Sequence, residues 1–168
     1  MASFEEHIAQ AKSNLAFLEQ INYFQNNKWD WQVTVSFYVG VHLMNAHIAK
    51  IANLHYRSHE KTKEALNPFN ELSHVRLDEK RYLDYVKLEG LARRSRYLCS
   101  DNKFNKETKQ FLTNELQLGK AVKHLDALMS FVNTKHGTQF PIISINCKSI
   151  IDINLIYFQF KPILYTEE

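Results

Sequence analysis

The sequence is poor in the residues that make tight turns and cross-links. Its 168 residues include four glycines, three prolines and two cysteines. So few glycines and prolines disfavour a β-sandwich or barrel with many tight turns, and they favour long helices. Cys99 and Cys147 lie far apart, so they indicate neither a disulfide framework nor the paired thiolates of a zinc ribbon. We expect both to be reduced and structural.

Long apolar runs are also missing. A membrane-spanning helix needs about 18 consecutive apolar residues, but polar side chains from Gln32 to His47 interrupt the most apolar stretch. The first residues are acidic and have neither the basic region nor the apolar core of a secretory signal. We therefore expect no membrane association and, by default, a cytoplasmic location.

Positive charge is modest and concentrated in the middle of the chain. The formal net charge of +3 is too small to indicate a nucleic-acid binder by itself. Residues 74–97, however, contain seven lysines and arginines against four acids. A solvated helix face and a phosphate-binding surface both explain such a run.

Apolar residues are abundant and follow a helical period in several segments. They make up 45% of the chain, which is enough for one domain with a hydrophobic core. A stripe with steps of three and four predicts a first helix over residues 4–26, and Ser3 with Glu6 forms a capping box before it. The stripe consists of Phe4, Ile8, Ala11, Leu15 and Leu18.

Residues 29–43 give a conflicting signal. Apolar and polar residues alternate there almost strictly, which is typical of a strand. The following residues, 44–53, are good helix formers, and no turn residue separates the two segments. We expect one long central helix, with a strand as the alternative.

Further helices are expected along the rest of residues 1–137. A short helix near 59–66 ends before Asn67 and Pro68. Apolar residues from Leu72 towards Arg96 mark another helix, and residues 101–105 form a break. A stripe from Phe111 to Val132 predicts a last helix, capped at Gly137.

The C-terminal residues 138–168 have a different composition, rich in Ile, Phe and Tyr. Two strands are expected over residues 140–146 and 150–160, with a turn near Lys148 and Ser149. An isolated hairpin is marginally stable, so it should pack on the bundle or pair with another chain. The predicted fold is mainly α, an antiparallel bundle of four to five helices followed by a C-terminal β extension.

Four polar clusters are candidate functional residues. Tyr38 and His42 are four residues apart and share one face of the central helix. A loop with His and Arg side chains can engage phosphate, and arginines near a helix C-terminus exceed what a cap needs. The loop and arginine clusters contain His55, Arg57, Ser58, His59, Arg93, Arg94, Arg96 and Tyr97. A polar loop, with Ser58 as a helix cap, and a core Tyr–His pair are the structural alternatives.

No cofactor or metal is expected. His55 and His59 have a spacing that can bind a metal on a helix, but no third ligand lies nearby in a usual arrangement. The sequence has no glycine-rich phosphate loop, no Gly-x-Ser-x-Gly and no His-Glu-x-x-His motif. Hydrolases and nucleotide-binding folds that depend on those motifs are disfavoured.

Part of the chain resembles small prokaryotic HEPN-type proteins. The run from Asp30 to Tyr38, with His42, Leu43 and Ala46, is similar to their central helix. Two later groups of polar residues are similar in kind and order: His55, Ser58 and His59, then Ser95, Arg96 and Tyr97. The resemblance covers roughly residues 10–135.

The resemblance implies an antiparallel helical bundle, usually a homodimer, tied to RNA cleavage, toxin–antitoxin pairs and phage defence. Active members of that superfamily carry an Arg followed four to six residues later by a His. This sequence departs from that pattern, because its close pair, Arg57 and His59, is spaced too tightly.

Two functional hypotheses follow. In the first, the chain is a binding module that recognises RNA, a nucleotide or a partner protein through the basic and aromatic residues. In the second, it is a metal-independent endoribonuclease, in which His59 or His42 takes the 2′-hydroxyl proton and Arg93 or Arg96 stabilises the charge on the phosphate. The missing Arg-to-His spacing favours the first.

Overall fold

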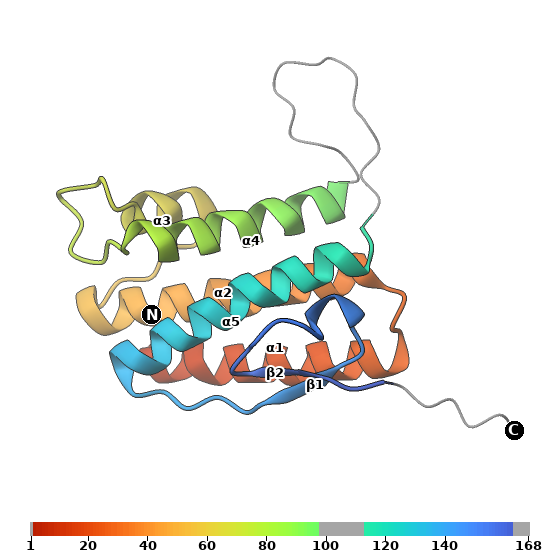
Figure 1. The fold of residues 1–168 in the computed structure, drawn as a ribbon. Helices are drawn as coiled ribbons and strands as arrows, with labels where there is room; N and C mark the ends of the chain where they lie inside the picture. Colours follow the sequence, from red (N-terminus) through yellow and green to blue (C-terminus); the bar gives the residue numbers. More distant parts are fainter. Residues whose placement is uncertain (1, 98–112, 163–168) are drawn as a thin grey trace, which may run out of the picture.

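The computed structural model describes residues 2–97 and 113–162. These residues form mainly helices with a small C-terminal sheet, which confirms the predicted fold class (Figure 1). The helices are α1 (Phe4–Phe24), α2 (Trp29–Ala52), α3 (His59–Leu66), α4 (Glu79–Tyr97) and α5 (Glu115–His136). The C-terminal elements are β1 (Ile143–Ile145), the 3₁₀ turn η1 (Lys148–Ile150) and β2 (Phe158–Phe160).

Helix α2 is the centre of the bundle. It packs against α1, α4 and α5, and successive long helices run in opposite directions (Figure 1). Most of its side chains are buried, including polar ones. Thr34 and Ser36 donate hydrogen bonds to the carbonyls of Asp30 and Gln32, four residues earlier. These bonds satisfy short polar side chains inside a buried helix, so the strand-like alternation was misleading and the helical prediction is confirmed.

Several helix ends follow local signals in the sequence. Ser3 and Glu6 form the predicted capping box at the start of α1. Gly137 ends α5 with a φ of 70°, in the left-handed region that favours glycine. Ser58 precedes α3 but makes no side-chain capping bond.

The helix expected from Leu72 begins later than predicted. Residues 67–78 form turns, and Leu72 is 91% exposed. α4 starts after Asp78, whose carboxylate accepts a hydrogen bond from the Arg81 backbone N–H. The expected break at residues 101–105, the apolar Phe111 and Cys99 lie outside the described residues.

The C-terminal strands pair in parallel, so the predicted hairpin is wrong. Ile143 pairs with Phe158, and Ile145 pairs with Phe160. Parallel strands cannot be joined by a tight turn, and the intervening chain forms η1 and a loop that buries Ile150. Side chains of α1 and α5 fix this segment on the bundle, because Glu19 and Asp126 accept hydrogen bonds from its backbone.

Within residues 2–97 and 113–162, no helix combines the length and apolar character needed to cross a membrane. In the same residues Cys147 is a free, buried cysteine. Burial raises the pKa of its thiol to about 11, so the thiol is protonated at neutral pH, as expected for a structural cysteine.

Candidate functional site

A pocket between α2 and α4 contains two of the predicted site residues. This α2/α4 pocket has a volume of about 410 Å³ and is lined by Asp30, Trp31, Thr34, Tyr38, Ser95 and Arg96. The α2 residues from Trp31 to Tyr38 are spaced by three and four, so they share one helix face. The Trp31 side chain is 61% exposed and that of Tyr38 is 39% exposed. The pocket therefore presents aromatic rings to solvent.

Arg96 is held at this pocket by aromatic rings. Its guanidinium carbon lies 6.0 Å from the ring centroid of Phe37 and 5.7 Å from that of Tyr97. Its Nε donates to the Ala92 carbonyl at 3.4 Å. A cation over an aromatic face is attracted to the ring's electrons, so these rings help to position the charge of Arg96 at the pocket.

Phe37 connects Arg96 with another candidate residue. The His59 ring lies 5.2 Å from the Phe37 ring, and the Tyr38 ring lies 6.0 Å from it. Phe37 itself is fully buried. His59 and Arg96 therefore share one aromatic neighbour, although they come from α3 and α4.

Three histidines from different segments form a hydrogen-bonded row. His7 Nδ1 lies 3.2 Å from His42 Nδ1, and His7 Nε2 lies 3.0 Å from His55 Nδ1. The His7 and His55 rings stack with an interplanar angle of 11°. We call these residues the histidine chain. His42 follows Tyr38 of the α2/α4 pocket by one helical turn.

No protein-family model, curated protein or solved structure matches this chain. The resemblance to HEPN-type proteins therefore stays a prediction from the residues.

Burial controls the charge of the histidine chain. It is the main cause that lowers the pKa of His7 to about 4, and the neighbouring His42 and His55 lower it further. The pKa of His42 is also lowered, first by burial and then by His55. His7 and His42 are thus neutral at neutral pH, where each ring has one N–H donor and one acceptor.

His7 was not among the predicted residues, although the sequence contains a signal for it. It is 3% exposed and lies four residues before Ala11, on the apolar stripe of α1. A histidine at a core position of an amphipathic helix needs a partner. The partners are His42 and His55. The sequence pattern therefore indicates that His7 needs a hydrogen-bond partner, but not which residues provide it.

A second histidine pair was also unpredicted. His47 Nδ1 lies 3.0 Å from His136 Nε2, and His47 Nε2 lies 3.2 Å from the Val75 carbonyl oxygen. Because a carbonyl only accepts, His47 donates from Nε2 and accepts from His136 at Nδ1. Burial is the main cause that lowers the His47 pKa to about 4. This pair joins α2, α5 and the loop before α4.

The remaining predicted residues do not gather at one place. Arg94 lines a different pocket, together with Lys120 and His124 of α5. Arg93 is exposed on α4, and Arg57 and Ser58 are exposed in the loop before α3. Arg94 and Arg96 are two residues apart, so they lie on nearly opposite sides of the helix. The arginine run is therefore not one cluster.

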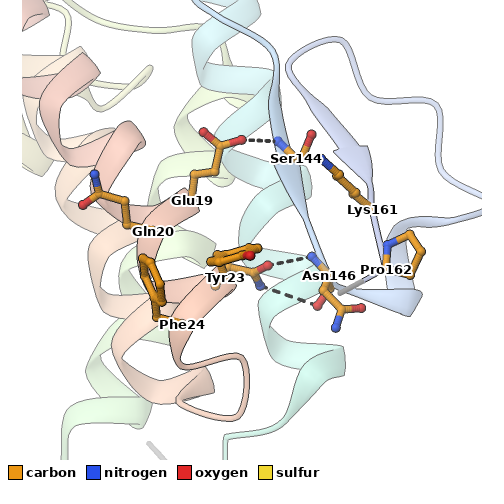
Figure 2. Close-up of a pocket in the computed structure, with 9 residues that line it drawn as sticks. Glu19, Gln20, Tyr23, Phe24, Ser144, Asn146, Lys161 and Pro162 are labelled. Carbon is orange, nitrogen blue, oxygen red and sulfur yellow. Dashed lines mark hydrogen bonds between the residues drawn. The ribbon is translucent and has the colours of Figure 1, made fainter. Parts of the chain in front are cut away.

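A further pocket lies between α1 and the C-terminal segment (Figure 2). It has a volume of about 470 Å³, and its lining includes Tyr23, Phe24 and Lys161. Figure 2 shows Glu19 accepting a hydrogen bond from the Ser144 backbone, which closes the outer edge of β1. Sequence reasoning did not anticipate this pocket, because it depends on where the C-terminal strands dock.

Acidic, cysteine and histidine side chains do not gather into a metal site in the part of the chain that the structure describes. No group of three or more such residues there could hold a metal ion. In the histidine chain, each ring nitrogen of His7 already faces a neighbouring imidazole. The three histidines are thus arranged for hydrogen bonding between their rings.

Proposed function

We propose that this protein binds RNA or a nucleotide at the α2/α4 pocket. The observation that carries the proposal is the pairing of exposed aromatic rings, Trp31 and Tyr38, with the Arg96 guanidinium in one pocket. Unpaired bases are bound by stacking on aromatic side chains. Arginine is well suited to phosphate because it offers a planar set of donors.

The polar groups of the pocket suggest an orientation for the ligand. Asp30 lies beside Trp31 at the start of α2, and Arg96 belongs to the end of α4. A carboxylate repels phosphate but accepts hydrogen bonds from base N–H groups. We therefore place the base near Trp31 and Asp30, and the phosphate near Arg96 and Tyr97. The pocket volume is within the range of small-ligand sites.

The test compares two arginine variants that remove the same charge. Arg96→Ala should weaken binding of a fluorescein-labelled single-stranded RNA by about tenfold, as expected for a lost charged hydrogen bond. Arg76→Ala, at an exposed arginine of the loop before α4, should change the affinity less than about twofold. Fluorescence anisotropy over a range of salt concentrations measures both.

Three outcomes would count against this proposal. These are no binding of the RNA at low salt, an equal loss of affinity in the two variants, and an affinity that does not change with salt concentration. Phosphate contacts release counterions, so binding through Arg96 must weaken as salt rises.

The alternative function is a metal-independent endoribonuclease. The observation that favours it is the shared contact of His59 and Arg96 with Phe37, because such a reaction needs a base and a cation close together. It predicts RNA cleavage to 2′,3′-cyclic phosphate ends in the presence of EDTA, abolished by His59→Ala. An intact RNA pool after incubation from pH 6 to 8 would rule it out.

The setting of either function is a prediction from the resemblance alone. It comprises a HEPN-type homodimer in a toxin–antitoxin or phage-defence system, with a possible partner protein. The RNA-binding test above does not depend on that setting.

A further inference from the structure

The loop that carries His55 is joined to the bundle through the histidine chain. Residues 53–58 connect α2 to α3. Among the described residues, the contact of His55 with His7 is the hydrogen bond that ties residues 54–57 to another element. The Tyr56 side chain packs against the core nearby. The imidazole contact therefore holds this loop together with the packing of Tyr56.

The number of protons that the histidine chain can accept follows from its two hydrogen bonds. Each of its two N–H···N contacts needs one hydrogen, and neutral His7 supplies a hydrogen to one contact and a lone pair to the other. One added proton is tolerated, because a charged His7 donates to both neighbours. A second added proton puts two hydrogens into one contact, which breaks that bond and places like charges side by side.

We propose that the histidine chain is a pH-sensitive latch, which holds residues 53–58 on α1 and α2 at neutral pH and releases them in acid. An imidazole that is exposed to water binds a proton in acid. The intact latch accepts one, so acid favours the open loop. This inference goes beyond the proposed function and does not depend on RNA binding.

The charged neighbours of the chain support this direction. Glu6 of α1 favours a proton on His7, but its effect is smaller than the opposing effects of burial, His42 of α2 and His55 of the loop. The Glu6 carboxylate also accepts a hydrogen bond from the Ser3 backbone N–H in the capping box. Among the described groups that act on His7 and His42, Glu6 is thus the acid, and its effect is too small to neutralise two added protons.

Release of the loop would affect residues of the candidate site. Arg57 and Ser58 belong to it, and His59, which contacts Phe37, begins the helix that follows. Release of the loop frees the segment that positions His59 beside the ring shared with Arg96. Acid would thus loosen one side of the candidate site while the packed helices remain.

¹⁵N relaxation of the backbone amides measures the latch directly. Between pH 7.5 and about pH 5, the order parameters of residues 54–58 should fall from about 0.85 to below about 0.6, while those of α4 stay at about 0.85. His7→Gln keeps an amide that donates and accepts but removes one titrating group, so the order parameters of its loop should fall less in acid than those of the wild type. His47→Gln is the matched control: a buried histidine in the other pair, which should leave the pH response of the loop as in the wild type.

The latch is overturned if the order parameters of residues 54–58 stay the same in acid. It is also overturned if His7→Gln retains the wild-type pH response, or if the order parameters of all helices fall together. Should His7→Gln fail to fold, NMR titration of the wild-type imidazoles decides the matter. His7 must then titrate well below the ordinary value of about 6.5, and the amide shifts of residues 53–58 must follow the protonation of the histidine chain. Ordinary titration or unresponsive amides refute the proposal.

Discussion

Asn22 is a buried amide that joins three parts of the chain. Its Nδ2 donates to Gln32 Oε1 at 2.8 Å, and its Oδ1 accepts from the Asn146 backbone at 2.6 Å. Gln32 in turn donates to the carbonyls of the turn between α1 and α2. This single side chain therefore links α1, the start of α2 and the C-terminal segment.

Removing this amide should be costly. Asn22→Ala leaves Gln32 and the Asn146 N–H without their partner, and each buried unsatisfied group costs about 1–3 kcal/mol. We expect the free energy of unfolding in urea to fall by about 3 kcal/mol. Asn14→Ala, at a partly exposed position that bonds to Gln10 on the same helix, should cost under about 0.5 kcal/mol. Equal losses of unfolding free energy in the two variants would show that the hydrogen bonds of Asn22 do not stabilise the fold.

Single residues also show that burial could be predicted from the sequence but long-range contacts could not. His7 lies on the predicted apolar stripe of α1 and Asn22 extends it by one turn, so the spacing predicts that both are buried. Their partners at residues 42, 55 and 146 lie far away in the chain, and no local pattern encodes such contacts. Phe37 was likewise readable as a core residue, but not as the shared neighbour of His59 and Arg96.

At the level of elements, η1 packs closely on α5 at a glycine. A Cβ placed on Gly119 would lie 2.7 Å from the Ser149 Cβ, closer than real atoms approach. Gly90 of α4 has open space around the same position, with nothing within 4 Å. The two helical glycines therefore form a matched pair for testing this contact.

The two alanine substitutions should have opposite effects. Gly119→Ala should lower the free energy of unfolding by about 1–3 kcal/mol, because η1 must shift. Gly90→Ala should raise it by about 0.5–1 kcal/mol, because alanine is the better helix former. Urea unfolding followed by circular dichroism measures both. A rise in the free energy of unfolding for both variants would mean that η1 does not pack on α5 at Gly119.

Elements with local signals were predictable, and elements set by docking were not. The capping box of α1, the glycine at the end of α5 and the Asn67–Pro68 stop after α3 lie in short stretches of sequence. Parallel pairing of β1 with β2 depends instead on side chains of α1 and α5 that receive the strands. The hairpin prediction failed because it used local turn residues alone.

For the whole molecule, the buried histidines make stability depend on pH. The pKa values of His7 and His47 are lowered to about 4, and those of His42 and His136 are lowered as well. Above about pH 6.5 these groups are neutral in both states. Between about pH 6.5 and 4 the unfolded chain binds protons that the folded chain does not, so stability is lost as pH falls.

Urea unfolding at pH 7.5, 6 and 5 tests this dependence. Each such histidine contributes at most about 1.4 kcal/mol per pH unit, and incomplete burial reduces this figure. His47→Gln should flatten the curve without changing the local latch. Asp126, whose pKa burial raises, acts in the opposite sense near pH 4. Equal stability from pH 7.5 to 5 would refute this account.

The proposed binding site for RNA or a nucleotide lies between α2 and α4. The most direct measurement is a titration of ¹⁵N-labelled protein with a short single-stranded RNA, followed by NMR. If RNA binds at the α2/α4 pocket, the signals of the Trp31 indole N–H and of the amides of residues 30–38 and 95–97 shift first, and these shifts become smaller at high salt. Shifts centred instead on Tyr23, Phe24 and Lys161, or no shifts at low salt, would contradict it.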